Sequence, residues 1–313
     1  MLKIGVVGTG HLGKIHLQNC LELTNAFEVI GFYDINPETR AQVAQQFQLK
    51  SFEQMSELLL EVDSVIIASS TSAHYALAVQ AMKHGKHVFI EKPVCLTSEE
   101  SKKLLTYSQE AGVIVQVGHV ERFNPAFTTA LPQIQHPFFM ETKRCAPFQS
   151  RGTDVSVILD LMIHDIDLAL TVAQSNVKRI MASGMEVVSQ TIDFASARLE
   201  FENGFVANLT ASRVEENRMR TTTFFMDKKK ISIDFLLKEV QQSVMDDSDE
   251  TNVWKQTILS IEDKNAIQME LLSFAEAIRD DKMPLVSLTD GHRALQIAEL
   301  IHEQITSSNQ FLK

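Results

Sequence analysis

The sequence predicts an α/β protein in which an N-terminal, doubly wound parallel sheet precedes a second α/β domain. Two observations carry this prediction. Short apolar runs alternate with helical patterns up to about residue 118, and longer β-rich runs follow. Alternating strands and helices are typical of a parallel sheet that is covered on both faces. The chain of 313 residues has the length of two ordinary domains, which we place at residues 1–120 and 121–313.

The expected strands of the first domain are short apolar runs that stop at glycine or at polar turn residues. They cover residues 2–7, 28–33, 63–69, 87–91 and 113–117. Helical patterns lie between these runs. One helix start is well marked, because Thr97 and Glu100 have the spacing of a capping box.

The second domain contains longer β-rich runs, at residues 177–201 and 204–212. Asn203-Gly204 between them is a hairpin signal, since both residues tolerate positive φ. Every other residue from Phe205 to Ala211 is apolar, so one strand face is expected to be buried. The opposite face is mixed and can line a site or an interface. Further along the chain we expect an acidic solvated loop at 246–250 and helices at 266–279 and 291–305.

Composition and charge argue against several classes of protein. Hydrophobic residues make up 44% and charged residues 22%, the balance of a globular enzyme. The formal net charge of -11 disfavours a surface for nucleic acid, whose phosphates require clustered Lys and Arg. No apolar run approaches the ~20 residues that span a bilayer, and the N-terminus enters a strand pattern at once, which predicts no signal peptide.

The three cysteines point to a reducing compartment. Cys20, Cys95 and Cys145 lie far apart and form no CxxC pair. We therefore expect neither a disulfide framework nor a metal site, and a cytoplasmic location.

A glycine-rich segment at residues 8–13 has the G-x-G-x-x-G spacing of a dinucleotide-binding turn, here between a strand and a helix. Gly8 permits the tight turn, Gly10 lets the backbone approach a pyrophosphate, and Gly13 allows the helix to pack close to the sheet. The helix N-terminus, which carries His11 and Leu12, offers amides and a positive dipole end to the phosphates.

Asp34 follows about 20 residues later, at the end of the second expected strand. Its carboxylate can accept hydrogen bonds from the ribose hydroxyls of adenosine and would repel a 2′-phosphate. Ile35 comes next, where an NADP-binding protein often has arginine. The sequence therefore predicts a Rossmann domain that binds NAD in preference to NADP. The alternative is a glycine-rich turn in some other doubly wound fold.

Lys92 is the first catalytic candidate. Glu91-Lys92-Pro93 closes the strand expected at 87–91, and ligands bind at the carboxyl ends of parallel strands. A lysine beside the nicotinamide can polarise a carbonyl or hold a hydroxyl. The alternative is a surface lysine before a turn-forming proline.

A second set of candidates lies in the helical segment 160–167. Asp160, His164 and Asp167 are spaced i, i+4 and i+7, which predicts that they share a helix face. A carboxylate one turn away can orient and tune a histidine, as a general base requires. Two alternatives remain open: a metal site, for which this set is a weak signal, and a helix start with favourable acids and one satisfied histidine.

Residues 118–125 form the hinge between the two domains and are unusually polar for a connector. Interdomain crevices favour ligand sites. The residues expected to contact substrate here are His119, Glu121, Arg122 and Asn124. The same stretch also suits a turn and a helix start with Asn124 as N-cap, and the two interpretations are compatible.

These segments, in this order, resemble the Gfo/Idh/MocA oxidoreductase family over nearly the whole chain. The likeness rests on residues 8–13, Asp34, residues 68–74, Glu91-Lys92-Pro93 and residues 160–167. It implies a large, mostly antiparallel open sheet in the second domain and NAD(P) chemistry on a sugar, inositol or sugar-nucleotide alcohol. It also implies roles for individual residues: catalysis for Lys92, Asp160 and His164, and cofactor contacts for Ser69, Ser70, Thr71, His74, Glu91 and Lys92. Together with the mixed sheet face, it predicts a homodimer or homotetramer.

Residues 117–125 and 151–167 are more narrowly similar to the branch of this family that oxidises the 3-hydroxyl of UDP-N-acetylglucosamine. A nucleotide sugar carries a diphosphate, which arginine forks bind well. The basic residues that gather in the second domain are Arg122, Lys143, Arg144, Arg151, Arg213, Arg218 and Arg220. We expect Arg151 and Arg213 to bind the diphosphate, and about half of the set to be ordinary surface charge. Met162 stands where relatives often have glycine, which weakens any transfer of specificity from the wider family.

The predicted reaction moves hydride from the carbon of a sugar hydroxyl, here the 3-hydroxyl of a UDP-N-acetylhexosamine, to NAD. His164, oriented by Asp160, takes the hydroxyl proton, and Lys92 binds the oxygen as it becomes a carbonyl. The sequence leaves open whether Lys92 or His164 is the main base. Three other functions also stay open: a dehydrogenase or reductase of a simple sugar, inositol or sugar phosphate, a non-catalytic NAD-binding regulator, and a reductase of a non-sugar such as a bile pigment.

Overall fold

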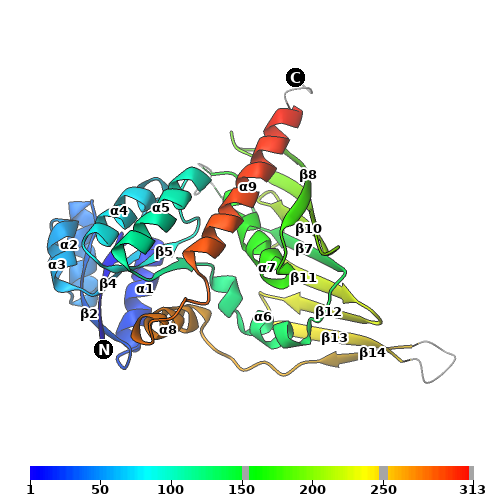
Figure 1. Cartoon of the computed structure of the whole chain (residues 1–313), viewed down its shortest axis with the longest axis horizontal. Coiled ribbons are helices and arrows are strands. Elements are labelled where there is room, and N and C mark those ends of the chain that lie inside the picture. Colours follow the sequence, from blue (N-terminus) through cyan, green and yellow to red (C-terminus); the bar gives the residue numbers. More distant parts are fainter. Residues whose placement is uncertain (150–154, 247–252, 310–313) are drawn as a thin grey trace. The chain divides into compact units, whose positions relative to one another are not determined.

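The structure, a computed structural model, describes residues 1–149, 155–246 and 253–309, and the chain divides into two compact units. Unit 1 comprises Met1–Val120 and Asn265–Leu295, and unit 2 comprises Glu121–Lys264 and Gln296–Lys313. Each unit is built on one sheet (Figure 1). The division differs from the sequence-based one because Asn265–Leu295, expected in the second domain, belongs to unit 1.

The sheet of unit 1 has six parallel strands in the order β3-β2-β1-β4-β5-β6. The strands are β1 (Leu2–Val7), β2 (Phe27–Tyr33), β3 (Ser51–Phe52), β4 (Ser64–Ile67), β5 (His87–Glu91) and β6 (Val115–Gly118). This is the doubly wound order of a Rossmann domain, in which the chain reverses direction across the sheet between β1 and β4. The expected parallel sheet is confirmed; the two-residue β3 was too short for its pattern to be recognised.

Six helices accompany this sheet: α1 (His11–Glu22), α2 (Pro37–Phe47), α3 (Met55–Glu61), α4 (Thr71–Lys83), α5 (Ser98–Ala111) and α8 (Ala266–Arg279). The side chain of Thr97 caps α5 by accepting the N–H of Glu100 at 3.2 Å. The Glu100 carboxylate accepts the N–H of Leu96, not that of Thr97, so the capping box is only half formed. Helix α8 joins unit 1 because its Leu271 and Phe274 are fully buried in the same apolar core as Leu17 of α1.

The sheet of unit 2 has eight strands in the order β14-β13-β12-β11-β7-β10-β9-β8, and among them only the β7–β10 pair is parallel. The strands are β7 (Phe139–Cys145), β8 (Val177–Met185), β9 (Phe194–Phe201), β10 (Val206–Ser212), β11 (Met219–Met226), β12 (Lys229–Asp234), β13 (Glu239–Asp246) and β14 (Val253–Ile258). The predicted open, mostly antiparallel sheet is therefore confirmed.

The hairpin predicted at Asn203-Gly204 joins β9 to β10. Strand β9 ends at Phe201 and β10 begins at Val206, so the connection is longer than the two-residue turn expected from the sequence. Within it, Gly204 takes a positive φ of 88° and Asn203 does not. In β10, Ala207, Leu209 and Ala211 are buried as predicted. Of the acidic segment 246–250, Asp246 ends β13 and forms an ion pair with Lys255, and residues 247–250 lie outside the described residues.

The remaining helical elements are η1 (Val120–Phe123), α6 (Pro125–Ala130), η2 (Leu131–Gln133), the π-helix η3 (Ile158–Met162), α7 (Ile163–Ala173) and α9 (Leu288–Asn309). In unit 2, α7 lies along one face of the large sheet and packs on β7 and β10 (Figure 1). Helix α9 contributes residues to both units. None of the described helices is long and apolar enough to cross a membrane.

Candidate functional site

The carboxyl ends of the unit 1 strands bring together most of the predicted cofactor residues. Val7, the last residue of β1, pairs with Tyr33 of β2 and with Ile67 of β4, and Glu91 of β5 pairs with Gly118 of β6. The segments that follow these residues therefore emerge at one edge of the sheet. They are the glycine turn at 8–13, Asp34, the segment 69–71 with Ser69, Ser70 and Thr71, Lys92, and His119.

The glycine turn has the geometry that its sequence predicts. Gly8 has a φ of 87°, and a Cβ on it would lie 2.7 Å from Cα of Ser69. A Cβ on Gly13 would lie 1.9 Å from the carbonyl oxygen of Gly8. Apart from its own chain neighbours, no described residue has an atom within 4 Å of the corresponding position on Gly10. Gly8 and Gly13 are thus required for close packing, whereas Gly10 leaves open space where a pyrophosphate can approach the backbone.

The N-terminus of α1 is also suited to a phosphate. Among the described residues, no side chain caps this end, and its first turn carries no acidic residue. The amides of His11 and Leu12 therefore have no acidic side chain of their own helix turn beside them. A helix end of this kind attracts an anion through its unpaired amides and its dipole.

Asp34 is held against the glycine turn. Its Oδ2 accepts the N–H of Thr9 at 2.7 Å and the hydroxyl of Thr9 at 3.0 Å, and its Oδ1 accepts the N–H of Asn36 at 2.9 Å. A carboxylate has further lone pairs, so it can still accept from a ribose hydroxyl. These contacts fix both the position and the negative charge of Asp34 beside the turn.

His74 lies beneath the predicted cofactor surface. It is 1% exposed, with Nδ1 3.0 Å from the carbonyl oxygen of Pro93 and Nε2 3.1 Å from that of Ser69. Burial lowers its pKa, although the two carbonyls oppose the shift. A neutral imidazole has a single N–H and donates to one carbonyl at a time. His74 therefore connects the segment after β4 to the segment after Lys92 and supports the site from below.

Glu91 is also buried, and its carboxylate contacts His16, a residue that was not predicted to belong to the site. Its Oε1 lies 2.6 Å from Nε2 of His16, and its Oε2 accepts the N–H of Lys92 at 3.1 Å. Although burial opposes the shift, the hydrogen bond and charge of His16 lower the pKa of Glu91. In the sequence, His16 is distinguished only as a polar residue next to the apolar Leu17 in the helix that follows the glycine turn. Lys92 itself is half-buried.

In unit 2, Asp160 and His164 flank the junction between the π-helix η3 and α7, and both are half-buried. Short π-helical segments often occur at functional sites. Asp167, predicted on the same face, is 1% exposed, and its two oxygens accept Nε and Nη2 of Arg122 at 2.8 and 2.6 Å. The π-helix alters the 3.6-residue period on which the shared face was predicted. Met162, which stands where relatives often have glycine, is fully buried.

A buried ionic network lies directly under α7. Arg144 of β7 donates to both oxygens of Asp165, at 3.0 and 2.9 Å, and to Oε1 of Glu121 at 2.8 Å. Although burial opposes the shift, the charges of Asp165 and Glu121 raise the pKa of Arg144. Oε2 of Glu121 accepts from Asn124 at 3.0 Å, and Asn124 caps α6 through the N–H of Ala126. This network holds the residue that follows His164.

The other residues predicted to bind substrate have different surroundings. Arg213 is 6% exposed, donates to the carbonyl oxygen of Val155 at 2.6 Å and lies 3.7 Å from Oδ1 of Asp193. His119 is buried in unit 1. Arg151 lies outside the described residues. Glu121, Arg122, Asn124 and Arg213 therefore all make internal contacts within unit 2.

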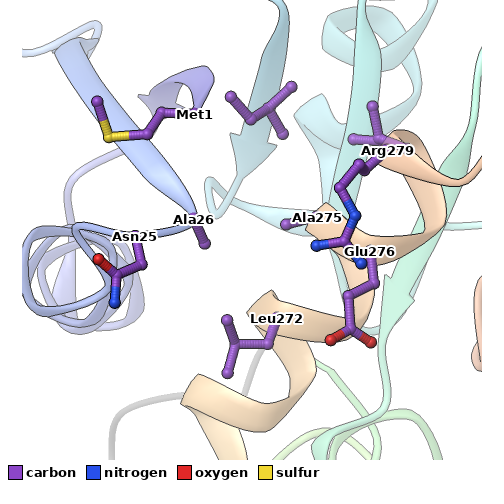
Figure 2. Close-up of a pocket in the computed structure, with 9 residues that line it drawn as sticks. Met1, Asn25, Ala26, Leu272, Ala275, Glu276 and Arg279 are labelled. Atoms are coloured by element: carbon purple, nitrogen blue, oxygen red, sulfur yellow. The ribbon is translucent and has the colours of Figure 1, made fainter.

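One hollow in unit 1 is unrelated to this chemistry. It has a volume of about 400 Å³ and is lined by Met1, Leu2, Asn25 and Ala26 together with residues of α8, including Leu272 and Arg279 (Figure 2). Leu2 begins β1, whereas Gly8 follows its end. The hollow is thus at the amino end of the strand, opposite the edge at which doubly wound sheets bind ligands.

A doubly wound parallel sheet with this glycine turn and an acid after β2 defines a dinucleotide-binding protein of the Rossmann class. The chain belongs to the Gfo/Idh/MocA family: residues 2–119 match its oxidoreductase domain with NAD-binding Rossmann fold, and residues 117–232 match the GFO/IDH/MocA C-terminal domain. It is thus an NAD-binding oxidoreductase, as the sequence predicted.

Two relatives are informative about substrate. The chain is 38% identical to UDP-N-acetylglucosamine 3-dehydrogenase of Acidithiobacillus ferrooxidans over 236 residues, 75% of this chain and 74% of the relative. The solved structure of that enzyme superposes with a TM-score of 0.92 over 98% of both chains, at 32% identity. Identity to scyllo-inositol 2-dehydrogenase (NAD(+)) of Bacillus subtilis is 28% over 231 residues, 68% of this chain and 67% of the relative.

Proposed function

We propose that this protein is an NAD-dependent dehydrogenase that oxidises the 3-hydroxyl of a UDP-N-acetylhexosamine to a ketone. The observation that carries the proposal is the similarity to UDP-N-acetylglucosamine 3-dehydrogenase, which extends over 98% of both structures. It is supported by Lys92 at the carboxyl end of β5, by Asp160 in η3 and by His164 in the first turn of α7. Bound NAD would supply the hydride acceptor.

The proposed mechanism divides the proton chemistry among three side chains. His164 takes the proton of the substrate hydroxyl, and the carboxylate of Asp160 orients its ring and stabilises the imidazolium that forms. Lys92 donates a hydrogen bond to the same oxygen as it becomes a carbonyl. The glycine turn at 8–13 would hold the pyrophosphate of NAD, Asp34 its adenosine ribose, and Ser69, Ser70 and Thr71 its nicotinamide half. His74 and Glu91 hold the surrounding backbone in place.

Among the residues predicted to contact substrate, internal contacts favour a supporting role for most. Glu121, Arg122 and Asn124 fix the segment that leads into α6, and Arg213 anchors the segment that precedes η3. We retain His119 and Arg151 as candidate substrate ligands.

We further propose a homodimer or homotetramer in the cytoplasm. The face of the large sheet opposite α7 exposes large apolar side chains, including Met181, Met185 and Phe225. Large apolar side chains exposed on a sheet face support an interface, although polar residues such as Arg198 and Glu141 lie between these strands on the same face. Light scattering after gel filtration should give a mass of two or four chains, and a mass of one chain at micromolar concentration would contradict the proposal.

A dehydrogenase of scyllo-inositol or a related cyclitol is the second candidate, and the 28% identity to scyllo-inositol 2-dehydrogenase favours it. One experiment separates the two candidates. The protein is incubated with NAD or NADP and with UDP-N-acetylglucosamine, UDP-N-acetylgalactosamine, scyllo-inositol, myo-inositol or glucose 6-phosphate, and reduced cofactor is followed by absorbance. We expect NADH formation with the UDP-sugars. Turnover of cyclitols together with inert UDP-sugars would replace the first proposal with the second.

A further inference from the structure

The described members of the basic set named from the sequence fall into two groups. Arg122, Arg144 and Arg213 are buried and bound to internal carboxylates or a carbonyl. Lys143 and Arg218 are exposed, and Arg220 is partly exposed. Because the side chains of the first group are bound within the fold, the second group contains the members of this set that are accessible to an anionic ligand.

The register of the sheet shows which of these residues faces α7. On β11, Arg220 is opposite Arg144 of β7, and Thr222 is opposite Thr142, with 3.1 Å between their hydroxyl oxygens. Arg144, Thr142 and Thr222 are all buried on the face that α7 covers. Side chains alternate along a strand. Arg220 therefore points to the same side of the sheet as α7, whereas Lys143 points to the other side.

Arg220 reaches the ionic network under α7 but adds only a weak contact to it. Its Nη1 lies 3.5 Å from Oε1 of Glu121, an oxygen that already accepts Arg144 at 2.8 Å. The other oxygen of Glu121 accepts from Asn124. The Arg220 side chain is 43% exposed, and a guanidinium carries several N–H donors in a planar fork. One end of Arg220 is thus positioned by Glu121, while the rest of the fork can meet a ligand.

Arg220 is close to charges of both signs. Burial and the neighbouring charge of Arg144 lower its pKa, and Arg218 contributes in the same direction, while Glu121 and Asp165 oppose the shift. Arg218 is two residues away on the exposed segment that leads into β11. Arg218 and Arg220 repel each other, and an anionic ligand with two negative charges that binds to both would remove this repulsion.

We propose that Arg220, assisted by Arg218, binds the diphosphate of the nucleotide-sugar substrate. This inference rests on the proposed function, and it transfers to these two residues the role that the sequence suggested for Arg213. Arg220 is linked through Glu121 and Arg144 to Asp165, the neighbour of His164 in the chain. The same network that holds α7 therefore also positions the residue that would recognise the substrate's charge.

The experiment measures binding of UDP, and separately of uridine, by calorimetry, together with steady-state kinetics on UDP-N-acetylglucosamine. The variants are Arg220→Ala, Arg220→Lys, Arg218→Ala and, as matched control, Lys143→Ala, which removes an exposed cation from the other sheet face. Arg220→Ala should weaken UDP binding and raise the KM by about 10- to 100-fold. Arg220→Lys should restore part of the loss, Arg218→Ala should have a smaller effect, and Lys143→Ala should have none. Uridine affinity should be equal in all variants.

Unchanged UDP affinity in Arg220→Ala, an equal loss in Lys143→Ala, or no UDP binding by the unmutated protein would each overturn the inference. Its failure is distinguishable from failure of the proposed function. If the protein oxidises UDP-sugars but Arg220→Ala behaves like the unmutated enzyme, only the subsite is wrong. If no UDP-sugar is oxidised although UDP binds through Arg220, the proposed reaction is wrong and the subsite stands.

Discussion

Nε2 of His16 lies 2.6 Å from Oε1 of Glu91, and both side chains are buried. His16 belongs to α1, the helix that follows the glycine turn, and Glu91 is the last residue of β5 and precedes Lys92. The second oxygen of Glu91 accepts the N–H of Lys92. The pair thus connects the dinucleotide-binding helix to the strand end that carries the proposed catalytic lysine.

This pair should contribute strongly and non-additively to stability. His16→Ala leaves a buried carboxylate without its nearest partner and should lower the free energy of unfolding by about 3–5 kcal/mol. In a double-mutant cycle with Glu91→Ala, the double variant should lose less than the sum of the single losses. Urea unfolding measures both quantities. His84→Ala, at an exposed histidine, is the control and should change stability by less than about 0.5 kcal/mol. Additive losses would show that the two side chains are not coupled.

The contact between His16 and Glu91 should also make the stability of the fold depend on pH. Because the pKa of Glu91 is lowered in the folded protein, its carboxylate stabilises the fold above the unfolded pKa of about 4.3, and this contribution is lost as the pH falls through the folded pKa. The difference in unfolding free energy between the unmutated protein and Glu91→Gln should therefore be constant near neutrality and shrink below about pH 4. A difference that grows in acid would reverse the assigned direction.

Asp34 should determine the choice of cofactor. Its carboxylate is fixed beside the glycine turn by Thr9 and Asn36, so a 2′-phosphate would meet a negative charge that cannot move away. We expect the unmutated protein to bind NAD more tightly than NADP in calorimetric titrations. Asp34→Asn keeps a hydrogen-bond acceptor but removes the charge, and it should narrow the discrimination more than it weakens NAD binding. Tighter binding of NADP by the unmutated protein would refute this assignment.

Substitution of Lys92 or His164 should lower the turnover number far more than it weakens cofactor binding. General acid–base groups typically contribute about 10²- to 10⁴-fold to rate, so Lys92→Ala and His164→Ala should each lower kcat by this order. Binding of NAD, measured by fluorescence titration, should change little. Lys83→Ala, at an exposed lysine of α4, is the control for loss of a positive charge. Near-normal turnover in both active-site variants would show that the site is misassigned.

A pH–rate profile of the same variants addresses which residue is the main base. If His164 is the base, the acidic limb of the kcat/KM profile should disappear in His164→Ala and persist in Lys92→Ala. The opposite pattern would assign the base to Lys92. If the acidic limb persists in both variants, neither Lys92 nor His164 is the group whose titration causes it.

Several elements of this fold are determined by short-range sequence signals. The strand–glycine–helix pattern at residues 2–13 predicted β1, the dinucleotide turn and α1, because a tight turn beside a phosphate site admits only glycine at Gly8 and Gly13. Asn203-Gly204 predicted the β9–β10 hairpin, and apolar periodicity predicted α8 at the bounds observed. Spacing and resemblance predicted Lys92, Asp160 and His164 as catalytic residues. Lys92 follows the end of β5, Asp160 lies in η3 and His164 in the first turn of α7.

Only the tertiary structure decided what these elements pack against. Periodicity predicted α8 but not its place in the core of unit 1. Asp167 was predicted to share a helix face with Asp160 and His164, but the π-helix η3 departs from the 3.6-residue period on which this prediction was based. The sequence likewise offered seven basic side chains of similar character, and the structure paired Arg122, Arg144 and Arg213 internally and left Arg220 partly exposed. The physical reason is that a guanidinium binds whichever carboxylate the fold places opposite it. That carboxylate can be tens of residues away in the chain, so the local pattern of apolar and polar residues cannot predict which one it is.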